Sequence, residues 1–295
     1  MKLRQAGALV KESAGAFSDH QAMSSSAAIA FYTMFSVAPL LVIAVGVAGL
    51  VFGQETARQE VIQHVQTDIG PGAAKMITEA MHRTQPKQSI WAIVVGGAIL
   101  LLGASAVFDQ LQTSLNTVWN VKPQSQGAKG IVRTRLLAFL MVFCVGLVLL
   151  GMLAISTVLA AVESLSSTLL PLAPWVWKVM DLAASLAVLV VLFAAVFKWV
   201  PDVRIRWRDV WFGALVTAAL FVAGKFGIGY YLGHSSITST YGAAGSLAAL
   251  LAWVYYSAMI FFFGAEVTRS YAHVKGREVT PSRHAQWVDQ ERRAA

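Results

Sequence analysis

Few side chains in this sequence could do chemistry, and most of the charged ones lie outside its long apolar stretches. Lys225 is the exception, because it interrupts the otherwise uncharged residues of 210–265. An ammonium group there has two interpretations: it attracts an anion into a cavity, or it extends along the helix to lipid headgroups. Asp109 and Glu266 end apolar stretches, and Arg269 follows Glu266 at the i,i+3 spacing of helical neighbours. For these two carboxylates we favour structural ion pairs.

Small residues, one proline and several tyrosines suggest where a substrate could approach the backbone. Pro39 cannot donate a hydrogen bond to the Phe35 carbonyl, so it marks either a kinked packing helix or a broken helix that offers backbone groups to a substrate. Glycines allow a second helix or a ligand to come close. We expect a polar path between the first, fifth and sixth apolar stretches. Its candidate residues are Tyr32, Pro39, Gly224, Lys225, Gly227, Tyr241, Gly242, Gly245 and Tyr256.

Constellations typical of catalysis or cofactor binding are missing from the sequence. Its six histidines are scattered without metal-ligand spacing, and its single cysteine, Cys144, cannot form a disulfide within the chain. No phosphate-binding loop or nucleophile motif is present. We therefore expect no metal, no cofactor and no enzymatic activity.

Composition predicts a membrane protein. The 295 residues are 57% hydrophobic and 13% charged, whereas soluble domains have about 25% charged residues. Six stretches provide the roughly 20 apolar residues that a spanning helix needs, and they are apolar on every face, unlike the strands of a barrel. The sequence therefore predicts an all-α integral membrane bundle of six transmembrane helices. The spans are expected at 27–52, 90–108, 136–162, 179–200, 210–232 and 243–269.

The remaining segments divide the chain into parts. We expect an N-terminal segment at 1–26, a transmembrane domain at 27–272 and a basic tail at 273–295. Between the first two spans, apolar residues recur at helical spacing over about 54–89, which predicts a short helical loop on the outer face. The second span is expected to continue as a helix beyond Asp109. The polar segment at 234–240 is expected to be the turn between the last two spans.

Charge predicts the orientation of these spans. Of the 23 Lys and Arg residues, 17 lie in the two terminal segments and in the second and fourth loops, and five lie on the other side. The positive-inside rule then places both termini in the cytoplasm. The net charge of +8 is thus a sign of topology and not of nucleic-acid binding. The expected partner is the lipid bilayer, including its anionic headgroups.

Several stretches of the sequence resemble the YihY/virulence-factor BrkB family of bacterial inner-membrane proteins. They are residues 28–39, 109–121, 198–202 and 241–266. The resemblance implies six spans and an inner-membrane location, but no settled activity. Some members carry a ribonuclease label, which these residues do not support, because phosphodiester hydrolysis needs a metal cluster or an acid–base pair.

The leading functional hypothesis is a transporter or lipid-handling protein for an anionic or amphiphilic solute, with Lys225 as the attracting charge. A membrane scaffold or assembly factor without a transport path is the alternative. A membrane-associated nuclease is the least favoured class.

Overall fold

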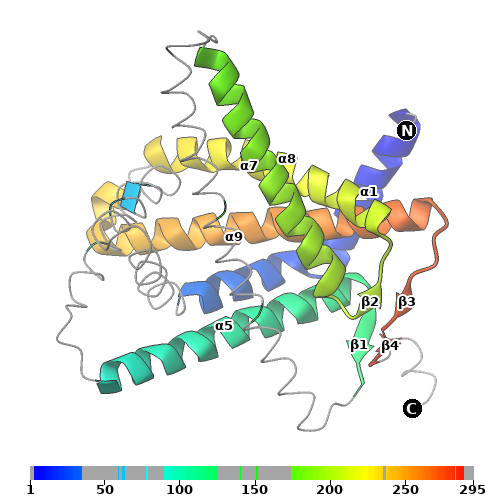
Figure 1. Ribbon diagram of the computed structural model, residues 1–295, viewed down its shortest axis with the longest axis horizontal. Helices are drawn as coiled ribbons and strands as arrows, with labels where there is room; N and C mark the ends of the chain where they lie inside the picture. The colour runs from blue at the N-terminus through cyan, green and yellow to red at the C-terminus, as the bar shows by residue number, and fades with distance from the viewer. Residues whose placement is uncertain are drawn as a thin grey trace.

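Long helices joined at one end by short strands make up the fold, as the computed structural model in Figure 1 shows. The structure describes residues 3–34, 90–124, 174–234, 237–282 and 284–288, together with positions 59, 62, 63, 78, 140 and 151. The helices are α1 (Leu3–Asp19), α5 (Ile90–Val118), α7 (Pro174–Trp199), α8 (Trp207–His234) and α9 (Ile237–Val274). The described part of the chain is thus mostly helical, as the sequence predicts.

Three helices in the described part of the chain, α7, α8 and α9, are long and apolar enough to cross a membrane. Within their apolar windows, only 28%, 39% and 22% of the residues are buried. A water-soluble bundle would cover most of such surface, so these outward apolar faces fit a lipid environment. The three helices overlap the predicted spans at 179–200, 210–232 and 243–269.

The helix boundaries agree with the expected ones at α5 and differ at the turn between α8 and α9. Helix α5 begins with the predicted second span at Ile90 and continues unbroken past Asp109 to Val118, as expected for its extension. The turn expected at 234–240 is shorter, because α8 ends at His234 and α9 begins at Ile237. Serine and threonine residues, which suggested a longer turn, can also lie within a helix, where their hydroxyl groups can donate to a backbone carbonyl four residues earlier.

Some predicted features lie outside the described residues. They are Pro39, the part of the 27–52 span that follows Met34, and most of the loop at 54–89 and of the span at 136–162. These features stay predictions.

Four short strands gather at one end of the helices, on the right in Figure 1, and we call this end the sheet end. The strand β1 (Val121–Pro123) pairs antiparallel with β4 (Ala285–Trp287), and β2 (Val203–Arg204) pairs antiparallel with β3 (Thr280–Pro281). The C-terminal segment thereby joins the end of α5 to the link between α7 and α8. The all-α expectation did not include these strands, which are only two or three residues long.

Asp202, in the link between α7 and α8, connects three parts of the chain at the sheet end. Asn116 of α5 is 3% exposed; its Nδ2 donates to Asp202 Oδ2 at 2.9 Å, and its Oδ1 accepts from the Asp202 N–H at 2.8 Å. Gln112 Nε2 donates to the same carboxylate oxygen at 3.3 Å. The Ser282 N–H donates to the Asp202 carbonyl at 2.9 Å. This network fixes the α7–α8 link on α5 and on the tail.

A second polar contact joins the start of α8 to the tail. Asp209, in the first turn of α8, is 1% exposed and pairs with Arg277. The Arg277 guanidinium lies 5.8 Å from the centroid of the Tyr271 ring, which in turn stacks on Phe212 at 4.2 Å. The buried carboxylate thus has a cation beside it, as a carboxylate away from water requires.

Helices α8 and α9 pack closely where a glycine of each faces a threonine of the other. A Cβ atom on Gly213 would lie 2.8 Å from Thr268 Cβ, and one on Gly264 would lie 2.8 Å from Thr217 Cβ. Each threonine hydroxyl donates within its own helix, Thr217 to the Gly213 carbonyl at 2.7 Å and Thr268 to the Gly264 carbonyl at 2.8 Å. The two reciprocal pairs set the separation of the helices, as small residues do in membrane bundles.

The larger of two apolar clusters lies between α5, α7, α8 and α9. Leu115 of α5 is fully buried in it. Its aromatic centre joins three helices: Phe193 and Phe197 of α7, Phe221 of α8 and Phe261 of α9, with Phe197 and Phe261 centroids 5.0 Å apart. This cluster holds the helices together on the side of the sheet end.

Helix α1 lies against α9, although the sequence analysis expected only a separate segment at 1–26. It buries Leu9 and the Phe17 ring contacts that of Phe263, with centroids 6.1 Å apart. The chain then bends at Gln21, whose φ of 52° lies in the left-handed region that side-chain-bearing residues rarely adopt. A new helix runs from Ala22 to the end of the described segment at Met34.

Candidate functional site

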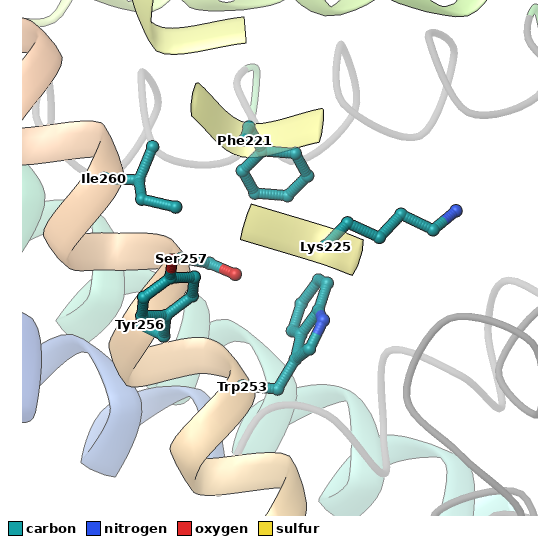
Figure 2. A pocket seen from close by; sticks show the side chains of 6 residues that line it. All are labelled: Phe221, Lys225, Trp253, Tyr256, Ser257 and Ile260. Atoms are coloured by element: carbon teal, nitrogen blue, oxygen red, sulfur yellow. The ribbon is translucent and has the colours of Figure 1, made fainter. Parts of the chain in front are cut away.

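A crevice between α8 and α9 contains the intramembrane lysine that the sequence singled out. Figure 2 shows its side chains, and the Lys225 ammonium group points away from Tyr256 and Ser257 toward the outside. The crevice is shallow, and no part of it between the two helices is wide enough for a water molecule. The lining residues are Phe221, Lys225, Trp253, Tyr256, Ser257 and Ile260.

The narrowness of this crevice comes from the packing of α8 on α9. Gly224 is buried, and a Cβ atom there would lie 2.6 Å from Ile260 Cδ1 and 2.8 Å from Tyr256 Cε1. The Phe221 and Trp253 rings meet edge to face with centroids 6.1 Å apart. The walls are thus two helices in close contact, with an aromatic and aliphatic lining and two hydroxyl groups.

Tryptophans near the start of α8 give the depth of the crevice in a membrane. Trp207 and Trp211 are each 43% exposed, and exposed tryptophans gather at the membrane–water interface. Lys225 follows Trp211 by 14 residues, which is about 21 Å of helix. This distance is more than half of the about 30 Å thickness of a hydrocarbon layer.

The structure brings some of the predicted path residues together and leaves others apart. Lys225, Gly224 and Tyr256 meet at the crevice. Tyr32 lies on the helix that begins at Ala22, where its ring contacts Phe31 at 5.8 Å. Gly227 is exposed, and a Cβ atom there would meet nothing within 4 Å, so no helix approaches it closely among the described residues.

The other predicted positions belong to the first turns of α9. Tyr241 and Gly242 are part of this helix, and Gly245 is buried in it. Four further residues line the crevice without having been predicted as path residues: Phe221, Trp253, Ser257 and Ile260. No charge or helix-breaking property distinguishes them from other residues in the same spans.

Glu266 is the most deeply buried of the expected structural charges. Its side chain is fully buried, and its Oε2 lies 3.8 Å from Arg269 Nη1, the neighbour that the i,i+3 spacing predicts. A shorter contact comes from a residue that the sequence did not indicate: His20 Nδ1 lies 2.6 Å from Glu266 Oε1. These two residues are 246 positions apart, so no local spacing could have paired them. Asp109 is exposed on α5.

The part of the chain that the structure describes holds no group of three or more His, Cys, Asp or Glu residues that could bind a metal ion. The crevice offers one cation, aromatic rings, an aliphatic side chain and hydroxyl groups as its chemistry. The ammonium group suits a negative charge, and the rings and the aliphatic side chain suit an apolar chain.

Comparisons with known proteins agree with this membrane architecture. The family model described as virulence factor BrkB matches residues 13–288. A UPF0761 membrane protein of Pseudomonas paraeruginosa is 27% identical over 257 residues, which cover 84% of this chain and 59% of that protein. A UPF0761 membrane protein of Xanthomonas campestris pv. campestris is 25% identical over 262 residues, or 86% of this chain and 58% of its own length.

The chain spans about three-fifths of the length of these curated relatives. No solved structure is significantly similar to it. The match to the family model nevertheless covers nearly the whole sequence, including the last part of α1, all the apolar helices and the strands of the sheet end. The chain is therefore a membrane protein of the virulence factor BrkB family.

Proposed function

We propose that this membrane protein moves or positions an anionic amphiphile, such as a phospholipid with a net negative headgroup. The observation that supports the proposal is Lys225 at the rim of an aromatic crevice, in a helix long enough to span the bilayer. The apolar lining suits an acyl chain, and the ammonium group at the rim suits an acidic headgroup. The cost of a charge within the bilayer, about 2.5–3.5 kcal/mol at its centre, favours a functional reason for this lysine.

The occupant has to open the crevice. Its walls leave no room for a water molecule, so an acyl chain enters only if the side chains of Trp253 and Tyr256 turn aside. We propose this side-chain movement as the step that admits the amphiphile from the lipid side.

We further propose that the protein lies in the inner membrane with both termini in the cytoplasm. The excess of Lys and Arg in alternate segments supports this orientation. Under it, the sheet end faces the cytoplasm and the crevice lies in the outer half of the bilayer. We propose no catalytic role.

Transbilayer movement of fluorescent lipids in proteoliposomes tests the function. We expect the protein to accelerate the movement of labelled phosphatidylglycerol more than that of labelled phosphatidylcholine. Lys225→Ala should lower the acceleration for phosphatidylglycerol about tenfold, because a contact with a charged group contributes about 1.5–3 kcal/mol. Lys225→Arg should keep most of it. Lys275→Ala, an exposed lysine of the sheet end, is the matched control and should act like the unmodified protein.

Two outcomes would overturn the proposal. If Lys225→Ala left lipid movement unchanged, the lysine would be a snorkelling residue without a role in transport. If the unmodified protein moved neither lipid, the scaffold alternative would be favoured, and the narrowness of the crevice is the observation that already supports that alternative.

A further inference from the structure

The contact between α1 and α9 has a polar part beside the Phe17–Phe263 ring contact. Six residues form this polar stripe: Glu12 and Ser13 of α1, His20 directly after α1, and Glu266, Ser270 and His273 of α9. The helices run antiparallel, because Glu12 Oε1 lies 3.3 Å from His273 Nδ1 and His20 Nδ1 lies 2.6 Å from Glu266 Oε1. Both cross-contacts are histidine–carboxylate pairs.

The two pairs differ in burial. The side chains of His273 and Glu12 are 83% and 42% exposed, so water and salt screen their attraction. The side chains of His20 and Glu266 are 13% and 0% exposed. Their attraction is therefore much less screened, and a change in the charge of His20 has a much larger effect on the contact.

One proton must lie between His20 Nδ1 and Glu266 Oε1, because a contact of 2.6 Å needs a donor and an acceptor. A second proton, on Nε2, turns the imidazole into an imidazolium and changes the contact from a neutral donor with a carboxylate to an ion pair. Histidine is the side chain whose charge ordinarily changes between about pH 5 and pH 8.

The polar stripe contains buried groups that no neighbour satisfies. Within the described residues, Glu266 Oε2, Ser13 Oγ and Ser270 Oγ are buried without a hydrogen-bond partner. Arg269 Nη1 is 3.8 Å from Glu266 Oε2, which is too far for a hydrogen bond. Unsatisfied buried oxygens weaken a purely structural contact, so a second role for this stripe is the better explanation.

His20 lies at the point where the chain changes direction. It follows the last residue of α1 and precedes Gln21, where φ is 52° and the helix axis changes. The His20–Glu266 contact thus holds α1 on α9 at the point where the chain bends. The other ionisable groups on the helices that pack here are Arg4, Lys11, Glu12 and Asp19 on α1, Arg269 and His273 on α9, and Asp109 on α5, which also packs on α9.

We propose that the His20–Glu266 pair is a proton-binding site that controls the docking of α1 on α9. Protonated His20 attracts the Glu266 carboxylate and holds α1 in place. Loss of that proton as the pH rises leaves a weaker contact between a neutral imidazole and the carboxylate, and α1 separates from α9 at the bend. The site does not depend on the lipid function proposed for the crevice.

Distances between two spin labels in the full-length protein in lipid nanodiscs test this proposal. The labels are placed at Gly7→Cys, where a side chain meets nothing within 4 Å, and at Arg208→Cys, which is exposed at the start of α8. Cys144→Ser removes the native thiol. We expect one short distance at about pH 5.5 and an added longer distance at about pH 8.5. A distribution that is the same at both values overturns the proposal.

Matched variants separate the buried pair from the exposed one. His20→Gln keeps a hydrogen-bond donor but cannot gain a charge, so its distance distribution should no longer change with pH. His273→Gln removes the exposed pair between the same two helices and should keep the change. A pH-dependent distribution in His20→Gln contradicts the proposal.

A third variant keeps the test informative if His20→Gln does not fold. Glu266→Gln removes the anion that attracts protonated His20, so the pH-dependent change in the distance distribution should be lost. A change that persists unaltered in Glu266→Gln would show that this carboxylate is not part of the site and would overturn the proposal.

Discussion

At Gly213 and Gly264, the lack of a side chain lets α8 and α9 approach until each glycine meets a threonine of the other helix. In a bilayer, such close contacts replace the hydrophobic effect as the force that holds helices together, since lipid tails are as apolar as the helices themselves. The effect of a single methyl group at these positions is therefore open to measurement.

We expect Gly264→Ala to destabilise the protein by about 1–3 kcal/mol, because the new methyl group overlaps Thr217 and the helices must separate. Unfolding by sodium dodecyl sulfate in mixed micelles, followed by circular dichroism, measures this change. Gly15→Ala is the control, since a Cβ atom there meets nothing within 4 Å. It should be neutral or stabilise α1 by about 0.5–1 kcal/mol.

The double variant Gly264→Ala with Thr217→Ala should recover part of the lost stability, because the second change removes the atoms that the new methyl group overlaps. Equal stability of Gly264→Ala and Gly15→Ala, or strictly additive effects in the double variant, would contradict the close contact.

The buried carboxylate of Asp209 leads to a second prediction at this scale. Arg277→Gln leaves Asp209 buried without its cation and should lower the free energy of unfolding by about 3 kcal/mol. Replacing both residues, as Asp209→Asn with Arg277→Gln, should cost less than Arg277→Gln alone. Arg208→Gln, at an exposed neighbouring position, should change stability by no more than about 0.5 kcal/mol. Similar losses for Arg277→Gln and Arg208→Gln would refute the role of the pair.

At the scale of elements, the C-terminal segment is the part whose role differs most from expectation. A short basic tail suggests a solvated end, yet residues 280–287 contribute one strand to each small sheet. Each sheet joins this segment to a different part of the chain, one following α5 and the other following α7. The tail therefore holds these two parts of the chain together at the sheet end.

Removal of residues 280–295 should release the end of α5 and the α7–α8 link. The strands β1 and β2 lose their only partners among the described residues, so their backbone becomes accessible. We expect trypsin to cut after Arg204 in β2 at least tenfold faster in the truncated protein, as followed by mass spectrometry. An unchanged cleavage rate at this site would show that the tail does not hold the α7–α8 link.

Sequence patterns predicted the elements that repeat one physical property over many residues. Apolar runs predicted α7, α8 and α9. The helical continuation that was expected beyond Asp109 is present in α5. The strands escaped prediction because they are two or three residues long and depend on pairing partners distant in the sequence. Local propensity carries little information about such pairs.

At the scale of the whole molecule, the C-terminal segment, the N-terminal part of α1 and the C-terminal end of α9 all lie at the sheet end. The contact between Glu12 and His273 places the N-terminal helix beside the end of α9. Both terminal segments therefore lie on one side of the bundle. We propose that this side is the cytoplasmic one, because the positive-inside rule favours that orientation.

Reporter fusions at each terminus test this topology. A green fluorescent protein joined to either end should be fluorescent, whereas alkaline phosphatase joined to either end should be inactive, since it folds only outside the cytoplasm. A phosphatase fusion after Gln54, in the loop expected on the outer face, is the positive control and should be active. Active phosphatase at one terminus would contradict the shared side.

Only some residues of the two candidate sites could be identified from the sequence. Lys225 was identifiable because a charge in an apolar stretch is costly, and Gly224 and Tyr256 were predicted with it and meet it at the crevice. His20 was not identifiable, because it lies before the first apolar stretch and its partner is 246 residues away. A charged residue is easily recognised in an apolar sequence, whereas its contact partner depends on how the helices cross.

The reciprocal glycine–threonine contact also restricts how α8 and α9 can move. Because the helices are antiparallel, a slide of one helical turn in one direction would place Thr217 against Thr268, and a slide in the other direction would place Gly213 against Gly264. The first arrangement overlaps and the second leaves a void, so neither offers a second stable position. The two helices therefore move together as one rigid body. Any change of shape that accompanies function has to occur by rotation of this pair of helices against α1, α5 or α7, or by side-chain movement within the crevice.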